Sequence, residues 1–257
     1  MKKILVLYVA HFINDFSLSQ YYKLKNELPD GYDIVWWLDD NCKSEIPNII
    51  EGIKFIKFPH DSIIINNEEY KWLINPTKYM EYLFEHDNKF ASYDYYWICE
   101  YDVYYNGNWK NFFTTCDQYN EDLIGANMFY YDKQYMIEHM NESFVPKKIY
   151  ETYDKVIKST ISLYRISNKG MKTIVAHNED NIKKYLYEVY IPTILYKNGL
   201  SLLGLNCERF WHDEIQNRYD DVKFIDCLRE DFYFDSLFTK KSQMNKHNKL
   251  FTRFKEQ

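Results

Sequence analysis

Residues 95–103 read Tyr-Tyr-Trp-Ile-Cys-Glu-Tyr-Asp-Val, a short apolar run that ends in two carboxylates. An uninterrupted run of aromatic and β-branched residues is typical of a strand that is covered on both faces. The pattern predicts a buried strand over 95–99, with Glu100 and Asp102 at its exit. In open α/β sheets the ligand-binding crevice lies beyond the carboxyl ends of the strands. The same stretch therefore predicts both a sheet and the position of a site.

Strand and helix patterns alternate upstream of this stretch. The predicted elements are strands over 4–9, 33–38 and 53–58 and helices over 17–28 and 76–86. Pro29-Asp30-Gly31 is a strong stop signal for the first helix. Alternation of this kind is typical of strand–helix–strand units that build parallel sheets.

Further elements are predicted downstream. They are strands over 122–126 and 162–167 and helices over 169–177 and 188–196. Ser167 is placed to cap the helix that follows it, Pro192 fits only near a first turn or at a kink, and Gly199 predicts a helix end. Together the elements predict an α/β fold with a mixed, mostly parallel Rossmann-type sheet flanked by helices.

Composition excludes several classes of protein. The chain has 257 residues, 46% of them hydrophobic and 27% charged, which is typical of a single globular domain. A net charge of -6 argues against a general nucleic-acid binder. The five cysteines contain no CxxC pair, so we expect reduced thiols rather than a zinc ribbon or a disulfide framework. No run approaches the roughly 20 apolar residues that span a bilayer, and we expect a cytoplasmic location.

Two carboxylates at positions i and i+2 of a turn can face one hard cation. The cation in turn binds diphosphate oxygens that would otherwise be repelled by the carboxylates. Glu100 and Asp102 therefore predict a site for Mn²⁺ or Mg²⁺ beside a phosphorylated ligand. The alternative is a solvated turn whose carboxylates cap a neighbouring element.

Residues 97–103 match throughout a Trp-x-x-Glu-Tyr-Asp-Val pattern, a DxD-like motif. In this the chain resembles bacterial, fungal and viral glycosyltransferases of the GT-A fold, and segments 164–170 and 188–193 are similar to the same group. The resemblance implies a GT-A-like nucleotide-binding sheet and a transferase of polysaccharide biosynthesis. Its donor would be a UDP- or GDP-sugar, and its acceptor a glycan or a lipid-linked glycan.

The resemblance also implies a division of the chain. A catalytic domain would cover 1–235, with a nucleotide-binding half over 1–110 and an acceptor half over 111–235. A basic tail over 236–257 would follow. Its part from 240 to 257 carries five lysines and one arginine interleaved with two phenylalanines, which predicts peripheral contact with an anionic membrane. A solvated tail is the alternative.

Site residues follow from the resemblance one by one. Asp102 would be the direct metal ligand, Glu100 a second or water-mediated ligand that can also reach the donor ribose, and His212 a further ligand. The nucleotide would be bound by the backbone of Val9, Ala10 and His11 and by Asp39 or Asp40. Each also has a structural alternative, since the aspartates suit turns and helix caps and a lone histidine among aromatics is more often structural.

Glu188 is the candidate catalytic base, because a carboxylate can take the proton of the acceptor hydroxyl as the anomeric carbon is attacked. One such displacement inverts the configuration. The alternative is a surface glutamate in the first turn of a helix.

Two other functions remain open. A sugar-phosphate nucleotidyltransferase would use similar acidic residues, but the chain has seven glycines and no GxGxxG or Walker pattern. A non-catalytic glycan-binding module could use the many aromatic residues for stacking on sugars, although dispersed aromatics are more often core.

Overall fold

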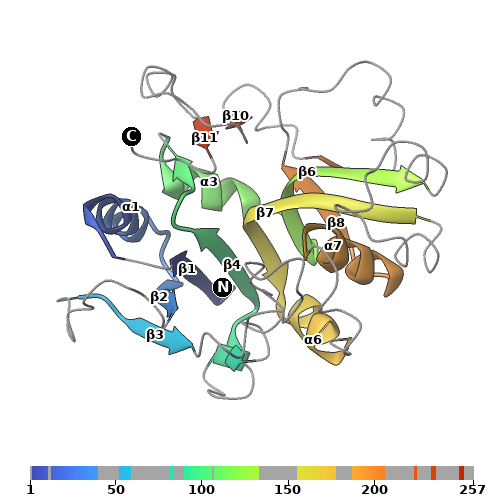
Figure 1. Ribbon diagram of the computed structural model, residues 1–257, viewed down its shortest axis with the longest axis horizontal. Helices are drawn as coiled ribbons and strands as arrows, with labels where there is room; N and C mark the ends of the chain where they lie inside the picture. Colours follow the sequence, from blue (N-terminus) through green and yellow to red (C-terminus); the bar gives the residue numbers. More distant parts are fainter. Residues whose placement is uncertain are drawn as a thin grey trace, which may run out of the picture.

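The computed structural model describes residues 2–10, 13–39, 52–58, 82–83, 90–105, 107–132, 155–177, 187–205, 223–224, 233–235 and 249–251. Its main body is an eight-stranded sheet in the order β3-β2-β1-β4-β7-β6-β8-β9 (Figure 1). All neighbouring pairs are parallel except the two that involve β7 (Lys155–Ser167). The predicted α/β class with a mixed, mostly parallel sheet is confirmed.

The first unit of the fold is β1 (Ile4–Ala10), α1 (Asp15–Asn26) and β2 (Tyr32–Asp39), followed by the edge strand β3 (Phe55–Phe58). Helix α1 begins two residues before the predicted start at 17, because Asn14 and Ser17 form a capping box. The Asn14 side chain accepts from the Ser17 backbone, and the Ser17 hydroxyl accepts from the Asn14 backbone. Of the helix predicted over 76–86, only Tyr82 and Leu83 lie among the described residues, and both are helical.

Strand β4 (Tyr95–Glu100) lies between β1 and β7 at the centre of the sheet. A short 3₁₀ helix, η2 (Phe90–Ser92), precedes it. The two-residue strand β5 (Tyr104–Tyr105) and helix α3 (Trp109–Cys116) follow it. The prediction that this run is a buried strand is confirmed, since Tyr96, Trp97 and Cys99 are each at most 1% exposed.

The second half of the sheet contains longer strands than the sequence predicts. Strand β6 (Leu123–Asp132) and β7 form a long antiparallel pair, in which each exceeds its predicted range because the other supplies its hydrogen-bond partners. Strand β8 (Leu202–Leu205) pairs in parallel with β6, and β9 (Lys223–Phe224) pairs with β8.

Helices α6 (Asn168–Ala176) and α7 (Tyr187–Lys197) follow β7 in the chain. Ser167 caps α6 as predicted, since its hydroxyl accepts from the Gly170 backbone at 2.9 Å. Pro192 lies inside α7. Gly199 ends that helix with φ 71°, and the bonds Gly199 N to Tyr196 O and Leu200 N to Leu195 O form a Schellman motif.

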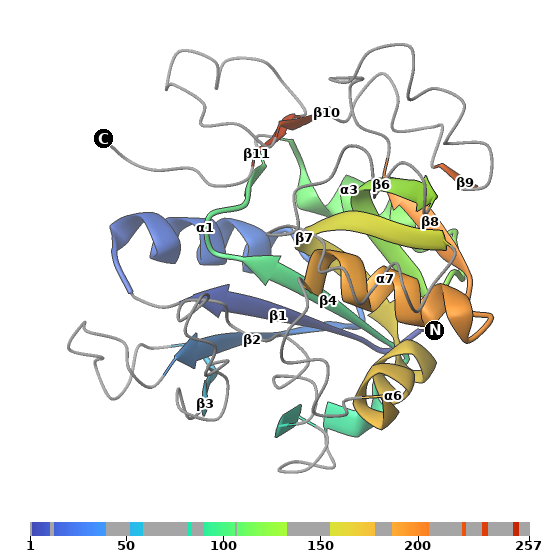
Figure 2. The same ribbon diagram turned by 45° about the vertical axis from the view of Figure 1, so that its right-hand side comes forward.

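Helices cover both faces of the sheet (Figure 2). Helices α1 and α3 pack on one face in a cluster rich in aromatic rings, among them Trp36, Trp97 and Phe113. Helices α6 and α7 pack on the other face against mainly aliphatic residues such as Leu7, Ile98 and Ile157. Strand positions therefore alternate between two separate cores, which is why the strands read as continuous apolar runs.

A second, three-stranded sheet joins distant parts of the chain (Figure 1). In it β11 (Lys249–Phe251) lies between β10 (Tyr233–Asp235) and β5. Residues 249–251 belong to the segment predicted to be a basic tail. Over this stretch the tail is a strand beside Tyr104–Tyr105, which are separated by Val103 from the acidic triplet Glu100-Tyr101-Asp102.

Two smaller predictions concern thiols and membranes. Cys99 and Cys116 are buried free thiols, as expected, and the other three cysteines lie outside the described residues. Within the described ranges, no helix combines the length and the apolar character that crossing a bilayer requires.

Candidate functional site

The order in which successive strands are added to the sheet reverses between β1 and β4. From β1 the chain proceeds outward to β2 and β3, whereas β4 lies on the other side of β1. Ligands of open α/β sheets bind beyond the carboxyl ends of the strands at such a switch point. In the register of these two strands Val9 lies opposite Glu100. The structure thus brings together the first-strand residues and the acidic triplet predicted from sequence.

Backbone hydrogen bonds define the turn that carries the carboxylates. The Tyr101 N–H donates to the Val9 carbonyl at 2.8 Å, so the chain leaves β4 while still attached to β1. The Val103 N–H then donates to the Glu100 carbonyl at 3.0 Å, and Val103 is buried. Asp102 lies inside this closed turn. It is partly exposed, yet its Oδ1 atom is buried.

The Tyr8 side chain also contacts this turn. Its buried hydroxyl lies 3.0 Å from the Ser17 carbonyl and 3.4 Å from the Tyr101 carbonyl, so that its single proton can serve either acceptor. It connects the first turn of α1 to the acidic turn. Sequence analysis missed this residue, because an apolar strand gives no signal that one of its tyrosines bonds to two later segments.

The charges of Glu100 and Asp102 act on their neighbours. Burial, then Asp102, then Glu100 raise the pKa of Tyr101 to about 12. Burial, followed by the same two carboxylates, raises the pKa of the Cys99 thiol. Burial is the larger cause of both shifts, and the two carboxylates add negative charge that disfavours a further anion beside them. A cation is the ligand that such an environment favours.

The two carboxylates are suitable donors for a hard divalent cation, which prefers carboxylate, carbonyl and water oxygens. In the described part of the chain, no group of three or more His, Cys, Asp or Glu side chains is arranged to hold a metal. Glu100 and Asp102 would therefore hold the cation together with the oxygens of water or of a diphosphate.

Several predicted site residues cannot be placed by their side chains. Asp39 ends β2 at the same edge of the sheet, where its backbone pairs with Phe58. Leu38, which precedes it, pairs with Ala10 at the end of β1. His11, Asp40 and His212 lie outside the described residues, so their predicted roles stay predictions.

Glu188 lies in the first turn of α7, and its Oε2 atom is 3.9 Å from Nζ of Lys158 on β7. The side chains are 18% and 26% exposed. Cys99 pairs with Leu163, and β7 runs antiparallel to β4. Lys158, five residues before Leu163, therefore lies beyond the carboxyl end of β4. Glu188 is thus at the same edge of the sheet as the acidic triplet.

The face of the sheet can be assigned as well. Ile98 packs in the cluster that contains Tyr190 and Ile191 of α7, and Glu100, two residues after Ile98, projects to that same face. Thr193 anchors α7 on β7, since its hydroxyl lies 3.0 Å from the nitrogen and 3.1 Å from the oxygen of Ile157. Glu100 and Glu188 therefore share a face and an edge, although they are far apart in sequence.

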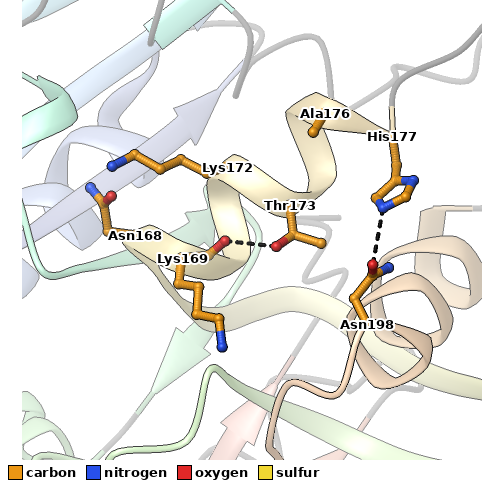
Figure 3. Close-up of a pocket in the computed structure, with 7 residues that line it drawn as sticks. All are labelled: Asn168, Lys169, Lys172, Thr173, Ala176, His177 and Asn198. Carbon is orange, nitrogen blue, oxygen red and sulfur yellow. Dashed lines mark hydrogen bonds between the residues drawn. The ribbon is translucent and has the colours of Figure 1, made fainter.

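An open pocket of about 450 Å³ lies on the opposite edge (Figure 3). Its lining comes from α6 and the end of α7, namely Asn168, Lys169, Lys172, Thr173, Ala176, His177 and Asn198. Asn168 bonds through its backbone to Asp94, just ahead of β4, which places the pocket at the start of the strand whose end carries Glu100. Sequence analysis did not single it out. Figure 3 shows two hydrogen bonds among these residues, from the Thr173 hydroxyl to the Lys169 carbonyl at 2.9 Å and between His177 Nε2 and Asn198 Oδ1 at 3.1 Å.

Comparison with known proteins adds a fold-level likeness. No protein-family model matches the chain, and no curated protein matches it. A solved structure with a similar fold is a candidate glucose-1-phosphate thymidylyltransferase from Bacillus anthracis in complex with a sucrose. It is 13% identical, with 95% of this chain and 98% of that chain covered and a TM-score of 0.48. Proteins this different in sequence and in superposition need not share an activity.

Proposed function

We propose that this protein is a divalent-metal-dependent glycosyltransferase that takes a sugar from a UDP- or GDP-sugar. The observation that carries the proposal is the register of Val9 with Glu100 at the switch point of the sheet, directly ahead of Asp102. A nucleotide bound in this crevice would bring its diphosphate beside two carboxylates. A divalent cation allows carboxylate and phosphate oxygens to share one site. The Trp-x-x-Glu-Tyr-Asp-Val resemblance supports the same assignment.

The residues of the two strand ends would have distinct roles. Asp102 would bind the cation directly. Glu100 would bind through water or contact the ribose. The backbone of Val9 and Ala10, and Asp39 at the end of β2, would border the nucleotide. The cation, when bound, would neutralise the diphosphate as it leaves.

Glu188 is proposed as the base that takes the proton of the acceptor hydroxyl. Its position on the face and edge of the sheet shared with Glu100 supports this role. Nζ of Lys158 lies 3.9 Å from Oε2 of the carboxylate and flanks it on one side. Attack on the anomeric carbon opposite the leaving diphosphate would invert its configuration.

A sugar-phosphate nucleotidyltransferase is the second candidate, and the similar fold of the candidate thymidylyltransferase agrees with it rather than with glycosyl transfer. Against it, the loop after β1 has no glycine: β1 ends at Ala10, the chain reads His11-Phe12-Ile13, and Asn14 caps α1. Close approach of a triphosphate to backbone N–H groups usually needs glycines at this turn.

Ligand binding separates these functions. Isothermal titration of the full chain with UDP, GDP, UTP and dTTP, each with and without Mn²⁺, should give binding of a nucleoside diphosphate that depends on Mn²⁺. Product analysis completes the test. Release of a nucleoside diphosphate from a sugar nucleotide supports transfer, whereas release of pyrophosphate from a triphosphate and sugar 1-phosphate supports the alternative. Binding of glycans with no nucleotide would point to a non-catalytic module.

We further propose that the segment 240–257 contacts an anionic membrane, where it would hold the enzyme beside a lipid-linked acceptor if the acceptor is of that kind rather than a free glycan. Each basic residue near such a surface contributes about 1 kcal/mol. Because Lys249–Phe251 form β11, deletion of the segment would also disturb the small sheet. Charge removal at Lys240, Lys241 and Lys246 is the cleaner change. Co-sedimentation with phosphatidylserine vesicles should fall, and unchanged co-sedimentation would eliminate the membrane contact.

A further inference from the structure

Tyr164 of β7 carries a buried hydroxyl that has no hydrogen-bond partner among the described residues. The residue is 1% exposed. Tyr96 on the neighbouring strand packs in the same core, and its hydroxyl donates to the Phe90 carbonyl at 2.7 Å and accepts from Asn168. Nearly all buried polar groups in proteins are hydrogen-bonded, so an exception calls for a reason.

The register of the sheet brings Tyr164 close to Glu100. Tyr164 lies directly opposite Ile98 in the antiparallel pair of β4 and β7. Glu100 is two residues beyond Ile98 and projects to the same face, so it is the diagonal neighbour of Tyr164. Diagonal neighbours are about 7–8 Å apart, a distance that an aromatic side chain can bridge. Burial raises the pKa of Tyr164, and the charge of Glu100 raises it further.

We propose that Tyr164 is a positioning residue, whose hydroxyl donates a hydrogen bond to the Glu100 carboxylate when that carboxylate holds the divalent cation. This inference rests on the proposed function, because it requires a cation at Glu100 and Asp102. It goes beyond that function by assigning a partner to the carboxylate from the adjacent strand.

The chemistry of the phenol suits this role. A tyrosine with a raised pKa remains protonated at neutral pH and donates one hydrogen bond without adding charge. A neutral donor fixes the orientation of a carboxylate ligand while leaving its negative charge for the metal. Partners of this kind typically change metal affinity by about 10- to 100-fold when they are removed.

The test is Tyr164→Phe in the full-length protein, with Mn²⁺ as the probe and electron paramagnetic resonance to measure free Mn²⁺. We expect Mn²⁺ affinity to fall by about 10- to 100-fold. Without metal, the melting temperature should stay the same or rise, because the variant removes a buried hydroxyl that lacks a partner. The matched control is Tyr96→Phe, which should lower the melting temperature and leave Mn²⁺ affinity unchanged.

A double-mutant cycle with Glu100→Gln isolates the interaction. In the Glu100→Gln background, the added Tyr164→Phe change should have no further effect on Mn²⁺ affinity. Equal Mn²⁺ affinity of the wild type and Tyr164→Phe would overturn the inference and leave the cation site intact. A wild type that binds no Mn²⁺ would overturn the inference and the proposed function together.

Discussion

The two ends of the central strand β4 use acidic residues in different ways. At its start, Asp94 accepts from the Lys3 backbone at 2.7 Å, and Asp122 nearby accepts from the Ser167 hydroxyl at 2.7 Å and from the Ser201 backbone at 3.0 Å. At its end, the Tyr101 and Val103 N–H groups and the Tyr8 hydroxyl donate to backbone carbonyls of β1 and of the acidic turn. At the start of β4, carboxylates bond to distant segments of the chain. At its end, backbone bonds help to shape the turn that carries Glu100 and Asp102.

This difference indicates where function can reside. A carboxylate whose oxygens accept from backbone N–H groups contributes to stability, so replacing it lowers the free energy of unfolding. At the end of β4, replacing a carboxylate by the amide of the same shape leaves the printed backbone bonds of the turn in place. Variants at the end of β4 should therefore lose transfer activity and keep their free energy of unfolding. Variants near the start of β4 should keep transfer activity and lose free energy of unfolding.

The largest effect is expected for Asp102→Asn. The amide keeps the shape of the side chain but removes a charge from the proposed cation site, so turnover should fall to background. The melting temperature should remain that of the wild type, because the turn is shaped by its backbone. Activity like that of the wild type in saturating Mn²⁺ would show that Asp102 is not the metal ligand. Glu100→Gln should reduce activity less if that residue acts through water.

Glu188→Gln should lower the rate of transfer by about 10²- to 10⁴-fold, the usual cost of losing a positioned base. Nucleotide affinity should barely change, because the donor is proposed to bind at the ends of β1 and β4. Single-turnover kinetics and isothermal titration measure the two quantities separately. Normal turnover in this variant, or a product with retained anomeric configuration by NMR, would remove Glu188 from the role of base.

Arg165→Met should have the largest effect on stability near the amino edge. The fully buried guanidinium donates to the carbonyls of Cys116 and Tyr119 at 2.8 Å each and lies 3.9 Å from Asp117. Removing one member of a buried charged network costs about 3–5 kcal/mol. Urea unfolding should give a loss in this range, while the remaining folded protein binds Mn²⁺ with unchanged affinity. A loss below about 1 kcal/mol would contradict a structural role.

Asp122→Asn should have the smallest effect, since a single amide oxygen replaces two carboxylate oxygens that serve Ser167 and Ser201. The expected loss is about 1–2 kcal/mol of unfolding free energy, with transfer activity unchanged. Asp102→Asn and Asp122→Asn make the same chemical change at opposite edges of the sheet. If both variants lost activity with equal loss of stability, the contrast between the two edges would be wrong.

Local sequence patterns predicted most of the elements and one helix cap correctly. The strand over 95–99, the cap at Ser167 and the helix end at Gly199 all depend on residues within a few positions of one another. The start of α1 was misplaced although its signal was local, because Asn14 and Ser17 have the spacing of a capping box. The prediction that two carboxylates follow a buried central strand also came from sequence alone.

Sequence patterns alone were enough to predict the segments of β1, α1, β2, β4, α6 and α7 and the position of Glu100 and Asp102 at a strand exit, but not α3 or β8. The position of β7, antiparallel between β4 and β6, could be known only from the folded structure. This position makes Tyr164 the diagonal neighbour of Glu100. It also places Lys158, and with it Glu188, beyond the end of β4. The tertiary structure also decided that residues 249–251 pair with β5. The physical reason is that strand order and register are set by burial and backbone hydrogen bonds between distant segments, and no pattern within one segment encodes its neighbours.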